Sequence, residues 1–193
     1  MKYIKAFEQK SSTQLIEYIK NNTKDNFLDN IIKLVTYRYK FGTDLNAKDS
    51  NGDIALNIAS YSGQLNVVKI LIDAGADVNI QNDVGVTALM LSAYHNHLDV
   101  VKELIKAGAN LDLVSKNGNT ALIWSAYNHS DIEIMKELIK AGADWNIKND
   151  SYTYFFELLP GRYKEIIKKE FPKEYEDHMT YLDMLETTKK YNL

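Results

Sequence analysis

Histidine has the widest chemical scope of the residue types in this chain, and three of its four histidines fall close together: His95, His97 and His129. Imidazole nitrogens bind zinc and transfer protons, so histidines on neighbouring elements could hold a metal ion or act as a general base. No HExxH or other zinc-binding spacing accompanies them, and the absence of cysteine excludes thiolate ligands and thiol nucleophiles. A metal-binding or enzymatic protein that uses these three histidines is therefore a remote alternative.

Motifs for catalysis or for cofactor binding are missing from the sequence. It has no phosphate-binding loop, no dinucleotide-binding fingerprint and no ordered set of Ser, His and Asp. We therefore predict that the protein is not an enzyme, and we expect neither a cofactor nor a bound metal.

A ladder of tyrosines is the second feature with chemical potential: Tyr61, Tyr94 and Tyr127 lie 33 residues apart. Tyrosine offers a large apolar area together with a hydroxyl group, and it is over-represented at the centres of protein interfaces. The regular spacing predicts that the three rings line up along one face. The alternative interpretation is that each ring packs against its neighbouring unit and contributes to stability only.

Glycines repeat with the same period, which indicates that the chain contains a repeated unit. Two sets recur every 33 or 34 residues: Gly52, Gly85 and Gly118, and Gly42, Gly75, Gly108 and Gly142. Three independent ladders with one period predict a stack of similar units, because a single unit of this size cannot bury its own apolar face.

Residues 82–114 show the physical logic of one unit. Thr87 can cap a short apolar helix at 88–94 by accepting a backbone N–H bond. Apolar residues then recur at helical spacing between 98 and 105, and Gly108 can end this second helix in a left-handed conformation. Each unit is therefore predicted to contain two helices and a turn.

The strings that open and close the units identify a known pattern. GDIAL, GVTAL and GNTAL stand at the starts, and IDAGADVNIQN, IKAGANLDLVS and IKAGADWNIKN stand at the ends. Over residues 49–148 the chain resembles the ankyrin repeat family. The resemblance implies an all-α ankyrin-repeat solenoid in one domain: a divergent N-terminal capping repeat at 1–48, repeats at 49–81, 82–114 and 115–148, and a degenerate repeat with a helical C-terminal cap at 149–193.

Several departures from the family pattern lead to separate expectations. Ile54 stands where the family has a threonine cap, so the first helix of that unit has to rely on Asp53 or begin loosely. We interpret Trp124 as a packing residue, and we expect Trp145 to cover an aromatic cluster at the end of the stack. The lysines of the second helices are expected to form a solvated face: Lys69, Lys102, Lys106, Lys136 and Lys140.

The two ends of the chain are expected to be helical caps. We predict helices at 12–21 and 26–39, and further helices at about 162–169 and 175–190 with an interruption at Pro172. The pair Leu159-Pro160 before a helix is also weakly similar to F-box-like motifs at the ends of some poxviral ankyrin proteins. A capping role for this segment is the simpler interpretation.

In ankyrin proteins the concave face binds the partner, and it is formed by the hairpin tips and the exposed side of the first helices. The resemblance places the helix contribution at Tyr61, Ser62, Tyr94, His95, Tyr127 and Asn128. It places the hairpin contribution at Asn51, Asp53, Asp83, Val84, Val86, Lys116, Asn117 and Asn119. These residues form the candidate partner-binding site.

The functional hypothesis is a protein–protein interaction module that acts as an adaptor, an inhibitor or an immunity-type protein. The alternative is a secreted effector whose groove engages a eukaryotic host protein. The net charge of -3 predicts no nucleic-acid partner, and no apolar run approaches the roughly 18–20 residues that a membrane helix needs. We expect a cytoplasmic monomer. Export by a route that needs no signal peptide is kept as an alternative.

Overall fold

The computed structural model describes residue 19, residues 44–127 and residues 132–191, with no description of the side chains at 190 and 191. Apart from residue 19, the helices predicted at 12–21 and 26–39 lie outside these residues. Residues 128–131, which include Asn128 and His129, also lie outside them. The account below concerns the described residues only.

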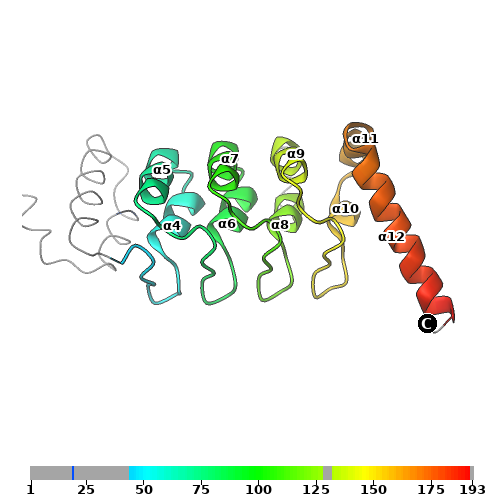
Figure 1. The fold of residues 1–193 in the computed structure, drawn as a ribbon, viewed down its shortest axis with the longest axis horizontal. Helices are drawn as coiled ribbons and strands as arrows, with labels where there is room; N and C mark the ends of the chain where they lie inside the picture. Colours follow the sequence, from blue (N-terminus) through cyan, green and yellow to red (C-terminus); the bar gives the residue numbers. More distant parts are fainter. Residues whose placement is uncertain (1–18, 20–43, 128–131, 192–193) are drawn as a thin grey trace, which may run out of the picture.

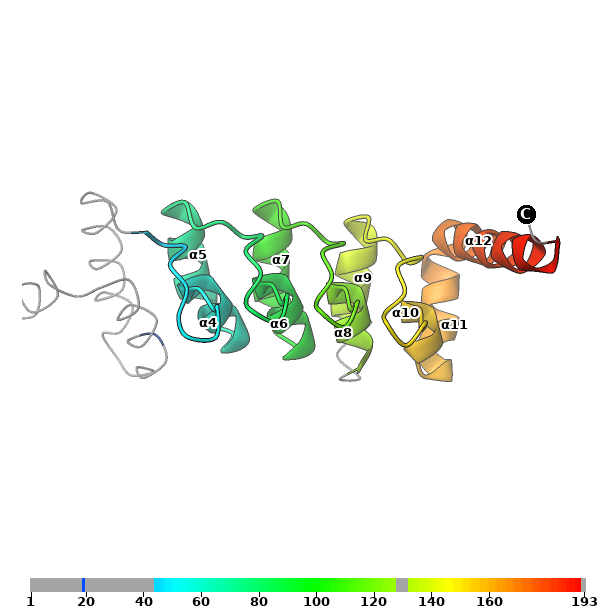
Figure 2. The same cartoon turned by 90° about the horizontal axis from the view of Figure 1, so that it is seen from below.

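Three helix pairs stand side by side in a row, as Figure 1 shows. The pairs are α4 (Ala55–Tyr61) with α5 (Leu65–Asp73), α6 (Ala88–Tyr94) with α7 (Leu98–Lys106), and α8 (Ala121–Tyr127) with α9 (Ile132–Lys140). Hairpin loops project from one edge of the row, and Figure 2 views the molecule from that edge. The described part of the chain contains helices and no strand, which confirms the predicted all-α solenoid.

The core runs continuously through the row because equivalent apolar residues of successive pairs meet. Leu56, Leu89 and Leu122 occupy the same position in the three first helices, and none is more than 1% exposed. Val68, Val101 and Met135 do the same in the second helices and are fully buried. No single pair could cover these side chains, so the stacking itself stabilises each unit.

The hairpins are joined to one another by backbone hydrogen bonds. The amide of Asp83 donates to the carbonyl of Asn51, and that of Lys116 donates to the carbonyl of Val84, over 3.2 and 3.0 Å. Gly85 has a φ of +77°, and a Cβ atom there would lie 2.9 Å from the Lys116 amide nitrogen. This position therefore needs glycine both for its backbone conformation and for the close approach of the next hairpin.

The first helices begin in two different ways. The Thr87 hydroxyl accepts a hydrogen bond from the Met90 amide at 3.3 Å, which confirms the predicted cap of α6. Helix α4 has no side-chain cap at Ile54. Asp53 does not cap the helix backbone: its carboxylate accepts bonds from the side-chain amides of Asn57 in α4 at 3.4 Å and of Asn82 in the next unit at 2.8 Å.

Three further helices complete the chain: α10 (Phe155–Leu158), α11 (Gly161–Glu170) and α12 (Pro172–Tyr191). The predicted interruption between the two helices lies at Phe171, and α12 begins at Pro172 and not at 175, because a first helical residue needs no amide proton. Trp145 is buried, with its ring 6.0 Å from that of Phe155, which confirms its expected place at the end of the stack. Helix α12 slants away from the last hairpin in both views (Figures 1 and 2).

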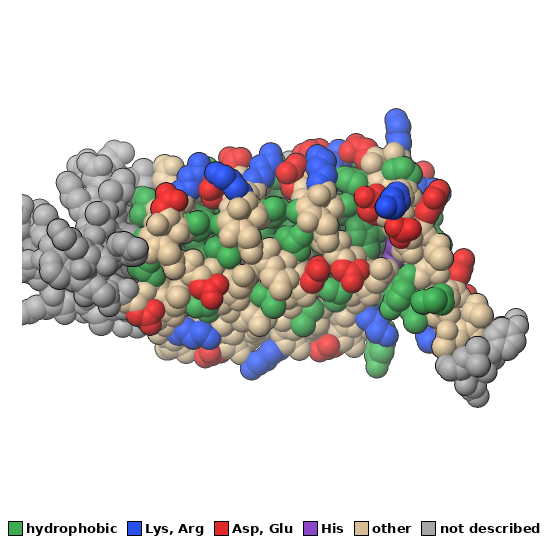
Figure 3. All heavy atoms as spheres, viewed as in Figure 1, with side chains coloured by type: hydrophobic (Ala, Val, Ile, Leu, Met, Phe, Trp, Pro, Cys, Tyr) green, Lys and Arg blue, Asp and Glu red, His purple; other side chains and the backbone are tan. Residues whose placement is uncertain are grey.

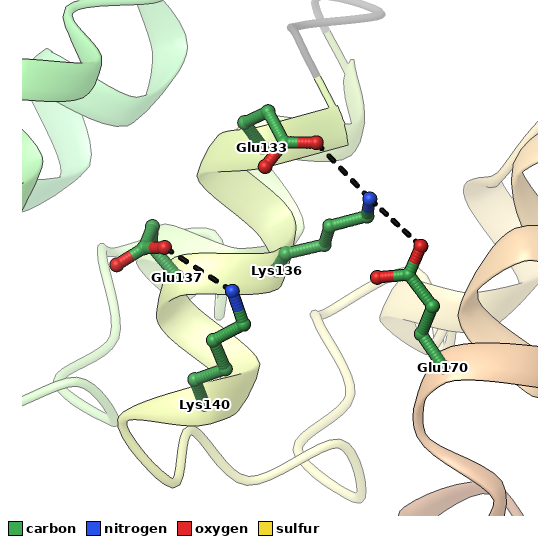
Figure 4. Close-up of polar contacts among 5 residues, drawn as sticks. All are labelled: Glu133, Lys136, Glu137, Lys140 and Glu170. Carbon is green, nitrogen blue, oxygen red and sulfur yellow. Dashed lines mark hydrogen bonds and ion pairs between the residues drawn. The ribbon is translucent and has the colours of Figure 1, made fainter.

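The expectation of a purely solvated lysine face is wrong for Lys136. Its side chain is only 13% exposed, and its ammonium group pairs with Glu133 on α9 at 3.0 Å and with Glu170 on α11 at 2.9 Å. Figure 4 shows Lys136 between the two carboxylates. These bonds raise the pKa of Lys136. The pair with Glu170 joins α11 to the last complete helix pair.

The remaining charges are spread without a strong excess of either sign. Figure 3 shows side chains of both signs along the edge that α5, α7 and α9 form, and again along the hairpins. Lys69 pairs with Glu103 of the next unit at 3.7 Å, and Lys140 pairs with Glu137 at 3.4 Å. Among the described helices, none is both long enough and apolar enough to cross a membrane.

Candidate functional site

The tyrosine ladder lies at the carboxyl ends of the three first helices. Tyr61 ends α4, Tyr94 ends α6 and Tyr127 ends α8. Residues before them in each helix are alanine and serine side chains that are buried in the stack. The tyrosines are different: Tyr61 is 52% exposed, Tyr127 is 45% exposed and Tyr94 is half-buried. The three first helices thus present aromatic rings to solvent at their ends.

His95 connects successive tyrosines. Its ring centroid lies 4.2 Å from that of Tyr61 and 5.1 Å from that of Tyr94, both in edge-on geometry. The Tyr94 ring lies 5.1 Å from Trp124 in the next unit. We call these four residues, Tyr61, His95, Tyr94 and Trp124, the aromatic run. It crosses three units, and its rings pack against one another while Tyr61 keeps about half of its surface exposed.

Trp124 was expected in the core, and sequence reasoning missed its place in the aromatic run. It packs against the core but is half-buried. The signal was weak, because the same position holds Ile58 and Leu91 in the other units. Only the contact with Tyr94 shows that the larger indole extends the run.

His97 has a structural role that differs from that of His95. Its Nε2 atom lies 3.0 Å from the carbonyl oxygen of Tyr61, and its ring lies so close to Gly63 that a Cβ there would be 2.5 Å away. His97 therefore joins the loops of two units. Burial lowers the pKa of His95, and the neighbouring His97 lowers it further, so His95 is neutral at pH 7.

Two of the three histidines of the metal-site alternative, His95 and His97, have other partners in the structure. Within the described ranges, no three His, Asp or Glu side chains come together as a set of ligands. His95 is surrounded by rings, His97 is bonded to the backbone, and His129 lies outside the described residues.

Tyr127 is exposed but also holds the last hairpin. Its hydroxyl accepts a hydrogen bond from the side-chain amide of Asn149 at 2.7 Å. The side-chain oxygen of Asn149, Oδ1, accepts bonds from the backbone amides of Ser151 and Thr153, both at 3.0 Å. The phenol thus orients the residue that shapes the hairpin, while nearly half of the side chain faces solvent.

Most of the predicted hairpin residues are exposed. The exposed members are Asn51, Asp83, Val84, Lys116 and Asn117, together with Ser62 beside the tyrosine ladder. Val84 is an apolar side chain that is 55% exposed at a hairpin tip. Asp53 is half-buried because it bonds to Asn82. Asn128 lies outside the described residues.

The prediction is wrong for Val86 and Asn119, which are 4% and 9% exposed. Both residues close a hairpin: the carbonyl of Val86 accepts a bond from Asn82, and the carbonyl of Asn119 accepts one from Ser115. Since the chain turns back toward the first helix at this point, their side chains face the protein and not the groove. We therefore exclude Val86 and Asn119 from the candidate site.

Tyr152 is an exposed aromatic residue that sequence reasoning missed. It is 75% exposed, and the ammonium group of Lys148 lies 4.7 Å from its ring centre. Tyr152 occupies the place that Gly118 has in the preceding hairpin, and its φ of +59° is the left-handed value of that place. The alignment of Asn149–Thr153 with Ser115–Asn119 is the signal that would have found it.

The comparisons with known proteins agree with this geometry. A family model described as ankyrin repeats in three copies matches residues 9–82 and 56–149, which together cover well over half of the chain. The matched residues contain helices α4 to α9 and the hairpins between them. Comparison with curated protein sequences finds no match.

Proposed function

Because the chain belongs to the ankyrin repeat family, we propose that it holds one partner protein on the surface formed by the aromatic run, Tyr127 and the exposed hairpin tips. Ankyrin repeats are in general modules for protein–protein interaction, and they are typically not enzymes. The specific role that we propose is that of an adaptor, an inhibitor or an immunity-type protein.

The observation that carries the proposal is the exposure of rings that are already held in place. Tyr61 is 52% exposed although its ring contacts His95, and Tyr127 is 45% exposed although its hydroxyl is bonded to Asn149. Rings fixed in this way lose little conformational entropy when a partner covers them. Tyrosine is also one of the residue types enriched among those that dominate binding energy at interfaces.

The electrostatic character of this surface supports an uncharged centre with a charged rim. The first helices contain no charged residue. Charges of both signs stand at the hairpin tips, where Asp83, Lys116 and Asp150 are exposed. This distribution is typical of interfaces with an apolar centre and a polar rim.

The test begins with capture of the partner from the source cells on the immobilised full chain. The partner is identified by mass spectrometry, and its affinity is measured by calorimetry for the native chain and for the double variant Tyr61→Ala, Tyr127→Ala. We expect the double variant to lose affinity by about 100-fold, since each such ring contributes about 1–2 kcal/mol at an interface. The melting temperature of each variant shows how much of the loss comes from stability.

Lys102→Ala is the matched control, because Lys102 is exposed on α7, a second helix. It should bind as the native chain does. An equal loss of affinity in the control and the double variant would contradict the proposal. The proposal would also be contradicted by a double variant that binds with native affinity.

A further inference from the structure

A ladder of side-chain hydrogen bonds joins the turns after the second helices. The side-chain oxygen of Asn46 accepts a bond from the backbone amide of Asp77 at 2.9 Å. Asn79 accepts one from Asn110 at 2.7 Å, and Asp112 accepts one from Asp144 at 2.9 Å. Each unit thus offers an acceptor to the backbone of the next unit, and the bonds recur with the period of the repeat.

Asn146 is the fourth acceptor in this ladder, and α12 supplies its donor. The Nδ1 atom of His178 lies 2.8 Å from the Oδ1 atom of Asn146. Since an amide oxygen only accepts hydrogen bonds, Nδ1 carries the proton and Nε2 does not. The imidazole of His178 therefore takes the place of the backbone amide that a following unit would provide.

The surroundings of His178 suit a neutral imidazole. The residue is 1% exposed, and the rings of Trp145, Tyr154 and Phe156 lie 6.2, 5.5 and 6.4 Å from its centre. Its Nε2 atom is buried and has no hydrogen-bond partner in the part of the chain that the structure describes. A second proton would have to sit on this atom, and a buried charge without a partner is costly.

The ionisable groups that face His178 come from two other elements. Glu157 on α10 and Asp144 in the turn after α9 favour the charged imidazole, whereas burial disfavours it and has the larger effect. The pKa of His178 is accordingly lowered. The phenol of Tyr154, whose pKa is raised by burial, stays neutral in the same pH range.

Helices α11 and α12 are attached to the stack by different means. In α11, Ile167 is fully buried and Glu170 pairs with Lys136 at 2.9 Å (Figure 4). In α12, Tyr175 and His178 contact the aromatic end of the stack, while Met184 is 58% exposed on the half that slants away (Figure 1). The two helices meet at Phe171 and Pro172.

We propose that α12 is a pH-sensitive latch on the end of the repeat stack, held closed by the neutral imidazole of His178 and opened by its protonation. Opening breaks the bond to Asn146 and moves α12 about the Phe171–Pro172 junction. Helix α11 stays docked, because the buried Ile167 and the ion pair between Lys136 and Glu170 hold it on the stack independently of His178.

The sign of the pH effect follows from linkage. The pKa of a free histidine is about 6.5, and burial in the closed latch lowers the pKa of His178 below this value. The contribution of His178 to the closed state is therefore fully present above the free value. As the pH falls below about 6.5, the open form takes up the proton first, and the closed-to-open ratio drops by up to about tenfold per pH unit until the docked pKa is reached.

Fluorescence energy transfer between two engineered cysteines tests the latch in the full chain. The native sequence has no cysteine, so labelling at Met184→Cys on α12 and Lys116→Cys on a hairpin is unambiguous. Both positions are exposed. We expect the transfer efficiency to change reversibly between pH 7.5 and pH 5, with a midpoint below about 6.5. A second pair, Lys69→Cys with Lys116→Cys, lies within the repeats and should not change.

His178→Asn is the matched variant, because the asparagine amide can donate from the position of Nδ1 but does not titrate. In this variant the efficiency should stay at the closed value over the same pH range. An unchanged efficiency in the chain with His178, or an equal change in the variant, would overturn the proposal.

A direct titration covers the case in which His178→Asn does not fold. Nuclear magnetic resonance of the imidazole nitrogens follows His178 in the otherwise native chain. A pKa clearly below about 6.5, with Nδ1 protonated at pH 7.5, supports the latch. A pKa at or above that value, or a proton on Nε2 at pH 7.5, rules it out.

Discussion

The imidazole of His95 lies 4.2 Å, centre to centre, from the phenol of Tyr61, although the two residues belong to successive units. His97, two residues later, reaches back to the same tyrosine but bonds to its carbonyl oxygen at 3.0 Å. One histidine therefore supports an exposed ring, and the other supports a loop. The two histidines should respond differently to the same substitution.

We predict that His97→Ala lowers the free energy of unfolding by about 1–2 kcal/mol, because it removes a hydrogen bond between units and the packing over Gly63. His95→Ala should cost less than about 1 kcal/mol in stability and should weaken partner binding by about tenfold. Urea denaturation and calorimetry with the captured partner measure the two effects. Equal stability losses with no change in affinity would contradict the assignment.

Gly85 and Gly108 provide a matched pair for the hairpin geometry. Both have a positive φ, +77° and +84°, but a Cβ at Gly85 would lie 2.9 Å from the Lys116 amide, whereas one at Gly108 would meet nothing within 4 Å. Gly108→Ala should cost about 1 kcal/mol from backbone strain alone. Gly85→Ala should cost at least about 2 kcal/mol, because the hairpin also has to move. Urea denaturation measures the free energy of unfolding of both variants. Similar losses in the two would show that the close approach of the next hairpin is unimportant.

At Tyr152 the opposite change can be tested, from a larger residue to glycine. It has a φ of +59° at the hairpin position where the preceding unit has Gly118, and its exposed side chain contacts Lys148. We expect Tyr152→Gly to leave stability unchanged or to raise it by up to about 1 kcal/mol, because glycine relieves the left-handed strain. Thermal and urea denaturation measure the effect. A loss above about 1 kcal/mol would mean that the ring contributes more than its exposure suggests.

Lys136 and Lys140 test the attachment of α11. Lys136 is 13% exposed and pairs with Glu133 and Glu170, whereas Lys140 is 55% exposed and pairs with Glu137 on its own helix. Figure 4 shows both. We predict a stability loss of about 1–2 kcal/mol for Lys136→Ala and at most about 0.5 kcal/mol for Lys140→Ala. Hydrogen exchange of the α11 amides should rise only in Lys136→Ala; equal protection in both variants would contradict the role of the pair.

Much of the fold could be predicted because the sequence signals for the helices and turns of a unit lie within that unit. The cap at Thr87, the apolar helices on either side of 95–97 and the helix end at Gly108 are signals within one unit. Repetition made them reliable, since the same residue types recur every 33 or 34 residues. The tyrosine ladder followed from the same regularity, and Tyr61 and Tyr127 are exposed at the ends of their helices.

Other features depend on contacts that have no periodic signal. Val86 and Asn119 look like hairpin tips in the sequence, but the path of the chain after the turn buries them. Trp124 became a neighbour of Tyr94, and His95 became a neighbour of Tyr61, through the stacking of units. Exposure and ring contacts of this kind are set by neighbours in space, so local patterns do not predict them.

The sequence by itself determined the repeated helix pairs, the positions of their turns and the approximate line of the candidate binding surface. The tertiary structure decided how the stack ends. His178 meets Asn146 across 32 residues, and Lys136 meets Glu170 across two helices. The physical reason is that helix and turn formation depends on neighbours along the chain, whereas a buried donor finds its acceptor only after the elements have packed.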